Sequence, residues 1–229
     1  MDIMTSLTHL GLTSQEAKLY ISLHSHGSAT GYEAAKLAGI SRSNAYAGLA
    51  SLVDKGGAHM IEGKPVRYQV VSTDEFCANR IRELEAIRND LRERLVLADE
   101  TESPYVTVKG SANITNKIHT MLENAKSRAY VAMPGHTLER FLPRLRALAA
   151  TKRKVVVITT SSAELPGATI HHAHAMPSGI RIICDSGVAL TGELDDGNDC
   201  TCLYSIKMNL VNLIRDSMRN EIKLIEHCK

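Results

Sequence analysis

The chain has 229 residues, of which 44% are hydrophobic, and its 27 Lys and Arg residues nearly balance 25 Asp and Glu residues. This length and apolar content exclude a disordered or fibrous protein and suffice for one large domain or two modest ones. No apolar run approaches the roughly 20 residues of a membrane-spanning helix, and the first residues lack the basic-then-apolar pattern of a secretion signal. We therefore expect a soluble, cytoplasmic protein.

The cysteines and aromatic residues narrow the classes of protein further. Five cysteines are an odd number, and they are scattered through a chain too long to need disulfide support, so we expect reduced thiols. Trp is absent and Phe occurs twice, which leaves few aromatic platforms for stacking single-stranded nucleic acid. A net charge of +2 neither requires nor excludes a polyanionic partner, because binding depends on where the charges lie.

Three short helices and a hairpin are predicted in residues 1–72. Helix-capping residues and glycine stops place the helices at about residues 13–27, 30–39 and 41–57. Two β-prone runs on either side of a Glu-Gly-Lys-Pro turn predict a hairpin over residues 58–71. This order of elements is that of a winged helix-turn-helix. The expected capping boxes are Thr13 with Glu16 and Thr30 with Glu33.

A long amphipathic helix is predicted over residues 73–100. Its apolar side chains recur at steps of three and four residues, so they form a stripe that must be buried. We expect this helix to pair with the same helix of a second subunit in a homodimer. Packing against the protein's own body remains the alternative, because Arg88 falls on the seam of a strict heptad. The stripe consists of Phe76, Ile81, Leu84, Ile87, Leu91 and Leu95.

A third region, residues 104–229, follows a helix-breaking stretch that ends at Pro104. Its pattern alternates β-prone runs with helices, so the expected fold of this region is α/β, a mixed sheet covered by helices. With the winged helix-turn-helix and the long helix included, the fold class expected for the whole chain is α+β / α/β. The expected helices are near Asn113 to Ala125, His136 to Ala150 and Leu210 to His227. The expected strands are YVTVKG, RAYVAM, KVVVITT, GATIHHA, IRIICD, VALTGE and CTCLYS.

The third predicted helix carries side chains suited to reading DNA. In a helix-turn-helix, the first residues of the second helix of the pair contact base edges in the major groove. Arg binds guanine through two hydrogen bonds, Asn binds adenine, and hydroxyls bind bases or phosphates. The hairpin adds Lys64 and Arg67, which we expect to contact the phosphate backbone. The expected reading residues are Ser41, Arg42, Ser43, Asn44 and Tyr46.

The charge of the predicted winged helix is low for a DNA-binding module. Residues 1–72 contain six Lys and Arg residues against five Asp and Glu residues, a net charge of +1. A monomer would make few phosphate contacts, so a dimer that doubles them is needed for firm binding to a double-stranded operator. The alternative is that this domain serves protein interaction or dimerisation.

The sequence resembles a known family across its first hundred residues. The run LGLTSQEAKLYISLHSHGSATGYEAAKLAGISRSNAYAGLASLVDKG, followed by the wing GKPVRYQVVS, is similar to the TrmB-type transcriptional regulators. The resemblance implies that Ser41 to Tyr46 form the recognition segment and Lys64 to Arg67 the wing. One departure is Gly56-Gly57-Ala58, where family members usually have a Gly-Leu-Val sequence at the end of the third helix.

The same resemblance implies a catalytically inactive, phospholipase-D-like C-terminal domain. The run IRIICDSGVALTGEL looks like the strand, turn and strand after the catalytic motif of active phospholipases D. Counted back from Asp185, the His and Lys of that motif are replaced by Ser178 and Ile180. We therefore expect no enzyme, but a domain that senses an effector, such as the sugars bound by some relatives, or that holds the dimer. The alternative is a phosphodiesterase with an appended helix-turn-helix.

Histidine and cysteine pairs leave a metal or redox site open. On a strand, residues two apart face the same way, so His172 with His174 and Cys200 with Cys202 each present two possible ligands. If the sheet brings the pairs together, a zinc or copper site becomes possible, and the regulator would respond to metal or redox state. The other interpretation is that these are ordinary strand and loop positions without a cofactor.

Overall fold

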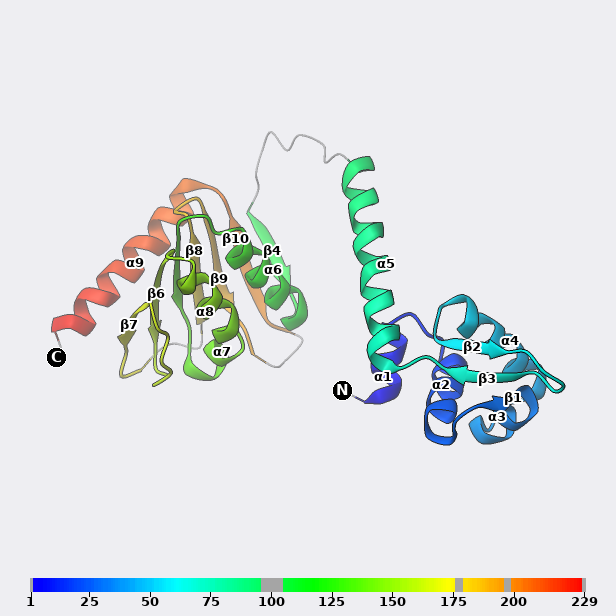
Figure 1. Ribbon diagram of the computed structural model, residues 1–229. Helices are drawn as coiled ribbons and strands as arrows, with labels where there is room; N and C mark the ends of the chain where they lie inside the picture. The colour runs from blue at the N-terminus through cyan, green and yellow to red at the C-terminus, as the bar shows by residue number, and fades with distance from the viewer. Residues whose placement is uncertain (1, 96–104, 176–178, 196–198, 228–229) are drawn as a thin grey trace. The chain divides into compact units, whose positions relative to one another are not determined.

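The computed structural model describes residues 2–95, 105–175, 179–195 and 199–227. The chain forms two compact units, Met1–Ala98 and Asp99–Lys229, and each is described by itself (Figure 1). The boundary predicted at Pro104 lies outside the described residues. In the described part of the chain, no helix combines the length and apolarity that crossing a membrane requires.

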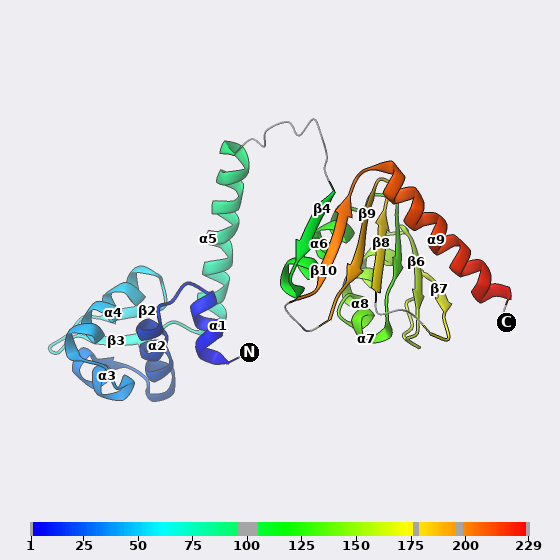
Figure 2. The ribbon, with the colours of Figure 1, turned by 180° about the vertical axis from the view of Figure 1, so that it is seen from behind.

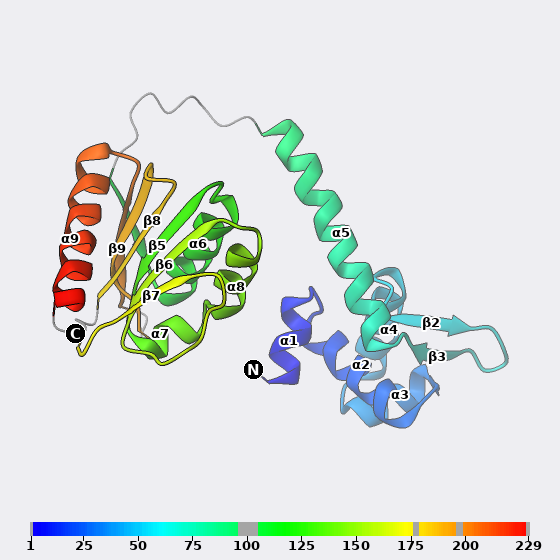
Figure 3. The same cartoon turned by 60° about the vertical axis from the view of Figure 1, so that its left-hand side comes forward.

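The first unit is a winged helix followed by a long helix. Its small antiparallel sheet has the strand order β1-β3-β2, and the hairpin β2–β3 extends beyond α3 and α4 as the wing (Figure 3). The helices are α1 (Ile3–His9), α2 (Ser14–His26), α3 (Gly31–Ala38), α4 (Arg42–Asp54) and α5 (Thr73–Arg94). The strands are β1 (Ala29–Thr30), β2 (Ala58–Ile61) and β3 (Arg67–Val70).

Local capping interactions start and stop the helices of the winged helix. Both predicted capping boxes form, and in the first the Glu16 carboxylate accepts a hydrogen bond from the Thr13 backbone N–H at 2.7 Å. Gly39 ends α3 with a φ of 64°, a left-handed conformation that glycine adopts without strain. Leu19, Leu23, Leu49 and Leu52 are completely buried between α2 and α4, so the helices share one core.

The start of α5 is anchored on the winged helix. Phe76 is completely buried, and its ring centroid lies 5.5 Å from that of Tyr20 on α2. The Tyr20 hydroxyl donates a hydrogen bond to the Val71 carbonyl at 3.0 Å, and Arg80 Nε donates one to the Leu10 carbonyl at 2.9 Å. The first two turns of α5 are therefore fixed to the domain that carries the wing. The predicted end of this helix, residues 96–100, lies outside the described residues.

The second unit is a mixed sheet of strand order β4-β10-β9-β8-β5-β6-β7 between two layers of helices. Strands β5, β6 and β7 are parallel, and the other neighbours are antiparallel. The strands are β4 (Val106–Lys109), β5 (Arg128–Ala132), β6 (Lys154–Thr159), β7 (Thr169–His172), β8 (Gly179–Cys184), β9 (Val188–Glu193) and β10 (Thr201–Ser205). The helices are α6 (Ser111–Asn124), α7 (Gly135–Glu139), α8 (Leu142–Ala150) and α9 (Met208–His227).

Alternation along the strands gives this sheet two apolar faces. On β8, Ile180 and Ile182 contribute to the core beneath α6, α7 and α8, while Ile183 packs with Val211 and Ile214 of α9. Figures 1 and 2 show α9 alone on its face of the sheet and the other helices opposite. The predicted fold class, an N-terminal winged helix and a C-terminal mixed sheet with helices, is confirmed.

One predicted helix is wrong in detail. The segment His136 to Ala150 forms two helices, α7 and α8, with a break at Arg140 and Phe141. Pro143 lies in the first turn of α8, where its missing N–H costs nothing, but inside a continuous helix it would remove a hydrogen bond.

Candidate nucleic-acid interface

The head of α4 presents the predicted reading residues to solvent. Ser41 is the N-cap, and its Oγ accepts a hydrogen bond from the Asn44 N–H at 3.3 Å, so this hydroxyl caps α4. Arg42, Ser43 and Asn44 are exposed on the first turn, while Ala45 beside them is buried. The capping interaction therefore fixes the backbone from which three polar side chains project.

Two tyrosines frame this head. The Arg42 guanidinium carbon lies 4.3 Å from the ring centroid of Tyr32, an exposed residue of α3 that sequence reasoning missed. The ring of Tyr46 lies against Gly31, where an added Cβ would come within 2.4 Å of it. Both contacts join the second helix of the helix-turn-helix pair to the first. A tyrosine directly after a glycine at a helix start is too weak a sequence signal to have placed Tyr32 here.

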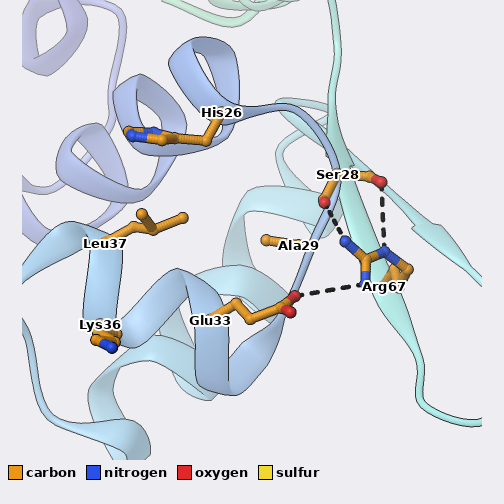
Figure 4. A pocket seen from close by; sticks show the side chains of 7 residues that line it. All are labelled: His26, Ser28, Ala29, Glu33, Lys36, Leu37 and Arg67. Atoms are coloured by element: carbon orange, nitrogen blue, oxygen red, sulfur yellow. Dashed lines mark hydrogen bonds and ion pairs between the residues drawn. The ribbon is translucent and has the colours of Figure 1, made fainter.

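The wing residues divide into one exposed side chain and one that is hydrogen-bonded within the fold. Lys64 is exposed at the tip of the β2–β3 hairpin. Figure 4 shows the Arg67 guanidinium hydrogen-bonded to the Ser28 carbonyl and hydroxyl and paired with Glu33 at 3.4 Å. Arg67 therefore joins β3 to β1 and α3, and any phosphate contact that it makes would compete with these partners.

A half-buried ion pair neutralises another cation of this unit. Lys55 Nζ lies 2.7 Å from a carboxylate oxygen of Glu16, which is 4% exposed, and 2.9 Å from the Gly11 carbonyl. Burial alone would raise the pKa of Glu16, but hydrogen bonds from Lys55, Ser51 and Thr13 outweigh burial and lower it. Lys55 thus stabilises the junction of α2 and α4 and adds little charge to a DNA-binding surface.

Within the first unit, no other element covers the apolar stripe of α5 beyond its anchored start in the described residues. Its side chains are about half exposed, with Ile81 at 54%, Leu84 at 52% and Leu91 at 46%. Of the predicted alternative, packing of the stripe against the protein's own body, the first unit by itself shows only the burial of Phe76. A helix with such a stripe gains free energy from a partner that covers it.

Comparison with protein families identifies both units. Residues 7–74 match the family described as sugar-specific transcriptional regulator TrmB. Residues 105–175 match the N-terminal subdomain of the effector-binding domain of TrmB regulators, and the two matches together span more than half of the chain. The chain belongs to the TrmB family of transcriptional regulators.

Individual relatives of this TrmB-family regulator are distant. The uncharacterized protein YrhO of Bacillus subtilis is 24% identical over 240 residues, which cover all of this chain and 87% of that protein. TrmBL2, an archaeal chromatin protein whose structure shows a novel mode of DNA binding, is 22% identical in sequence to this chain. The two structures match with a TM-score of 0.44 over 96% of each chain. Nuc of Salmonella typhimurium, a phospholipase D family member, is 11% identical with a TM-score of 0.44, over 52% of this chain and 93% of that one.

The histidine and cysteine pairs of this TrmB-family protein do not converge. His172 ends β7 at one edge of the sheet with His174 just beyond it, whereas Cys200 and Cys202 lie at β10, and four strands separate β7 from β10. The sheet therefore does not bring the two pairs together, which was the condition for the predicted zinc or copper site. Burial raises the pKa of the Cys202 thiol to about 12, so this thiol is protonated near neutral pH. In the described residues, no group of three or more His, Cys, Asp or Glu side chains is placed to hold a metal ion.

Asp185, from which the phospholipase D motif was counted, has a structural role. Its carboxylate accepts hydrogen bonds from the backbone N–H groups of Lys126, Ser127 and Arg128 at 2.7 to 3.0 Å, and from the Ser127 hydroxyl at 2.8 Å. Ile180, at the position of the motif Lys, is completely buried, and Ser178 lies outside the described residues. The carboxylate oxygens are thus directed into the fold at this turn.

Proposed function

We propose that this regulator binds a double-stranded operator as a homodimer, with the head of α4 of each protomer in the major groove. The observation that carries the proposal is the exposed, capped first turn of α4, where Arg42, Ser43 and Asn44 project without carboxylate partners in the described residues. Tyr32 and Tyr46 flank this turn and supply hydroxyls for phosphates. Lys64 at the wing tip adds a backbone contact.

The homodimer part of the proposal rests on α5. Its uncovered stripe of aliphatic side chains suits the same helix of a second copy, and Phe76 fixes the start of that helix to the winged helix. A change in the pairing of two α5 helices would therefore alter the spacing of the two recognition helices. Because half-site spacing must match the DNA repeat, such a change would alter operator affinity.

We assign the C-terminal unit the role of effector sensor without catalysis. The family description and the match to an effector-binding subdomain support a small-molecule effector, for which a sugar is the first candidate class. Two observations argue against phosphodiester hydrolysis. Ser178 and Ile180 replace the His and Lys of the catalytic motif, and the Asp185 carboxylate already accepts hydrogen bonds from backbone N–H groups.

The test is binding of the purified protein to its own upstream DNA. Arg42→Ala should weaken specific binding by about 1–3 kcal/mol, because it removes a base-reading side chain. Lys18→Ala, which removes one exposed positive charge from α2 of the same domain, is the matched control and should change affinity far less. Equal losses in the two variants would mean that Arg42 acts only through its charge. No specific binding by a folded wild-type protein would favour an interaction module instead.

A further inference from the structure

A pocket with an arginine-rich lining lies in the C-terminal unit, between α9 and the end of the sheet at which β5 begins. Its volume is about 250 Å³. No carboxylate is among the described residues that line it. The lining consists of Arg128, Tyr130, Ser186, Arg215, Arg219 and Ile222.

Three elements of the fold bring these residues together. Arg128 begins β5 and Tyr130 lies two residues further along it, and Ser186 lies in the turn between β8 and β9. Arg215 and Arg219 are four residues apart on α9, so they share one flank of that helix. The helix is held on the sheet by the buried side chains Val211, Ile214 and Met218, so the position of that flank is set by the core.

The positive charge in this pocket is incompletely compensated. Among the described residues, Arg215 Nε is buried without a hydrogen-bond partner, and it forms an ion pair at 3.8 Å with a carboxylate oxygen of Asp216. The same oxygen lies 3.7 Å from a terminal nitrogen of Arg219. Both separations exceed hydrogen-bonding distance, so the guanidinium groups keep donors for a ligand.

Besides Asp216, which offsets part of this charge, two other charged groups lie near the pocket. Lys154 Nζ lies 6.0 Å from the ring centroid of Tyr130 and adds a further positive charge beside the pocket. Asp185 precedes Ser186 in the chain, but its carboxylate accepts hydrogen bonds from the backbone of residues 126–128. A buried donor without a partner is costly, and an anion that accepts hydrogen bonds from it recovers that cost.

We infer that this pocket binds a small phosphate monoester, such as a phosphorylated sugar, and is the effector site of the C-terminal unit. The effector part of this inference rests on the proposed function of that unit. Guanidinium groups match the geometry of phosphate oxygens through paired hydrogen bonds. The hydroxyls of Tyr130 and Ser186 offer further donors, and the Tyr130 ring and Ile222 provide an apolar wall for the carbon skeleton.

The size of the pocket limits the ligand. A volume of about 250 Å³ is just below the usual range of roughly 300–1,000 Å³ for small-molecule sites. It therefore suits one small metabolite with a single phosphate group rather than a dinucleotide. Inorganic phosphate has the same recognition chemistry, so the experiment must separate the ester from the free anion.

The experiment is isothermal titration calorimetry of the full chain with glucose 6-phosphate, glycerol 3-phosphate, inorganic phosphate and glucose. At least one ester should bind, and glucose should not. Arg215→Gln and Arg219→Gln should each weaken ester binding about tenfold or more, because each removes a charge-assisted hydrogen bond. Lys223→Gln is the matched control, since it removes an exposed charge from the same helix outside the pocket. Its affinity should stay within about twofold of wild type.

Each outcome decides the inference. Tighter binding of an ester than of inorganic phosphate supports an esterified effector, and equal binding supports a phosphate site filled by the free anion. No binding of any phosphate probe at millimolar concentration overturns the site, as does unchanged binding in both Arg variants. Should Arg215→Gln fail to fold, Arg219→Gln decides, because the Arg219 side chain is 61% exposed and is not needed for packing.

Operator binding measured without phosphate separates this inference from the proposed function. Wild type and both Arg variants should bind the operator alike in that assay. Intact operator binding without phosphate binding overturns the effector site alone. Phosphate binding without operator binding leaves the site standing and overturns the proposed function.

Discussion

The carboxylate of Asp185 joins two turns of the C-terminal unit. Asp185 and Ser186 have φ values of 51° and 57°, and the Gly187 N–H donates to the Cys184 carbonyl at 3.1 Å, which closes a tight hairpin between β8 and β9. The same Asp185 carboxylate holds the backbone that enters β5. Burial alone would raise its pKa, but hydrogen bonds from Lys126, Arg128 and Ser127 outweigh burial and lower the pKa to about 2.

Replacement of this carboxylate should destabilise the C-terminal unit in a pH-dependent way. Asp185→Asn should cost about 1–2 kcal/mol near pH 6, a value reduced for partial exposure to solvent. Because the folded-state pKa lies below the unfolded-state value near 4, the contribution is complete above that value and is lost as the pH falls toward 2. Urea unfolding followed by circular dichroism from pH 6 to pH 2 should therefore show the wild type and the variant converging.

The control for this prediction is Glu139→Gln, which alters an exposed carboxylate on α7 and should leave stability nearly unchanged. A stability difference between wild type and Asp185→Asn that persists at pH 2 would contradict the linkage. In that case, the loss would come from the shape of the turn and not from the charge of the carboxylate.

At the scale of elements, α5 carries the main expectation for assembly. Leu84→Glu places a charge in the middle of the uncovered stripe and should weaken a dimer by about 3 kcal/mol, or roughly 100-fold. Asn89→Glu, an exposed position off the stripe, is the matched control. Analytical ultracentrifugation of both variants measures the effect. A Leu84→Glu protein that remains as dimeric as wild type would place the interface elsewhere.

Elements with strong local signals could be predicted from the sequence. The capping boxes of α2 and α3, the glycine that ends α3 and the strand β8 depend on neighbouring residues, and they form as expected. Helix α1 was not predicted, since its seven residues bury only Leu7. Strand β1 was not predicted either, because its two residues are a strand only through pairing with β3.

Features that depend on strand order could not be predicted. Cys202 and His172 belong to strands whose separation is set by the whole sheet, so the sequence could not exclude a joint metal site. The arginine pocket could not be predicted for the same reason, because Arg128, Ser186 and Arg215 are far apart in the chain. For the nucleic-acid interface, the positions of the α4 residues followed from local capping, whereas the partners of Arg67 depended on tertiary pairing.

At the scale of the whole molecule, charge and assembly are linked. The winged helix has a net charge of only +1, and two of its cations are paired internally, Lys55 with Glu16 and Arg67 with Glu33. One protomer therefore makes few phosphate contacts, and each contact releases about one counterion on binding. Firm operator binding should then require two winged helices on one DNA molecule.

This link predicts the salt dependence of operator binding. A plot of the logarithm of the binding constant against the logarithm of salt concentration should have a slope near −0.9 times the number of phosphate contacts. Leu84→Glu, if monomeric, should roughly halve that slope, because one winged helix replaces two, while Asn89→Glu should keep the wild-type value. Fluorescence anisotropy over a range of salt concentrations measures both slopes. An unchanged slope in a proven monomer would mean that a single protomer makes all the phosphate contacts, and α5 would then serve assembly without a role in DNA affinity.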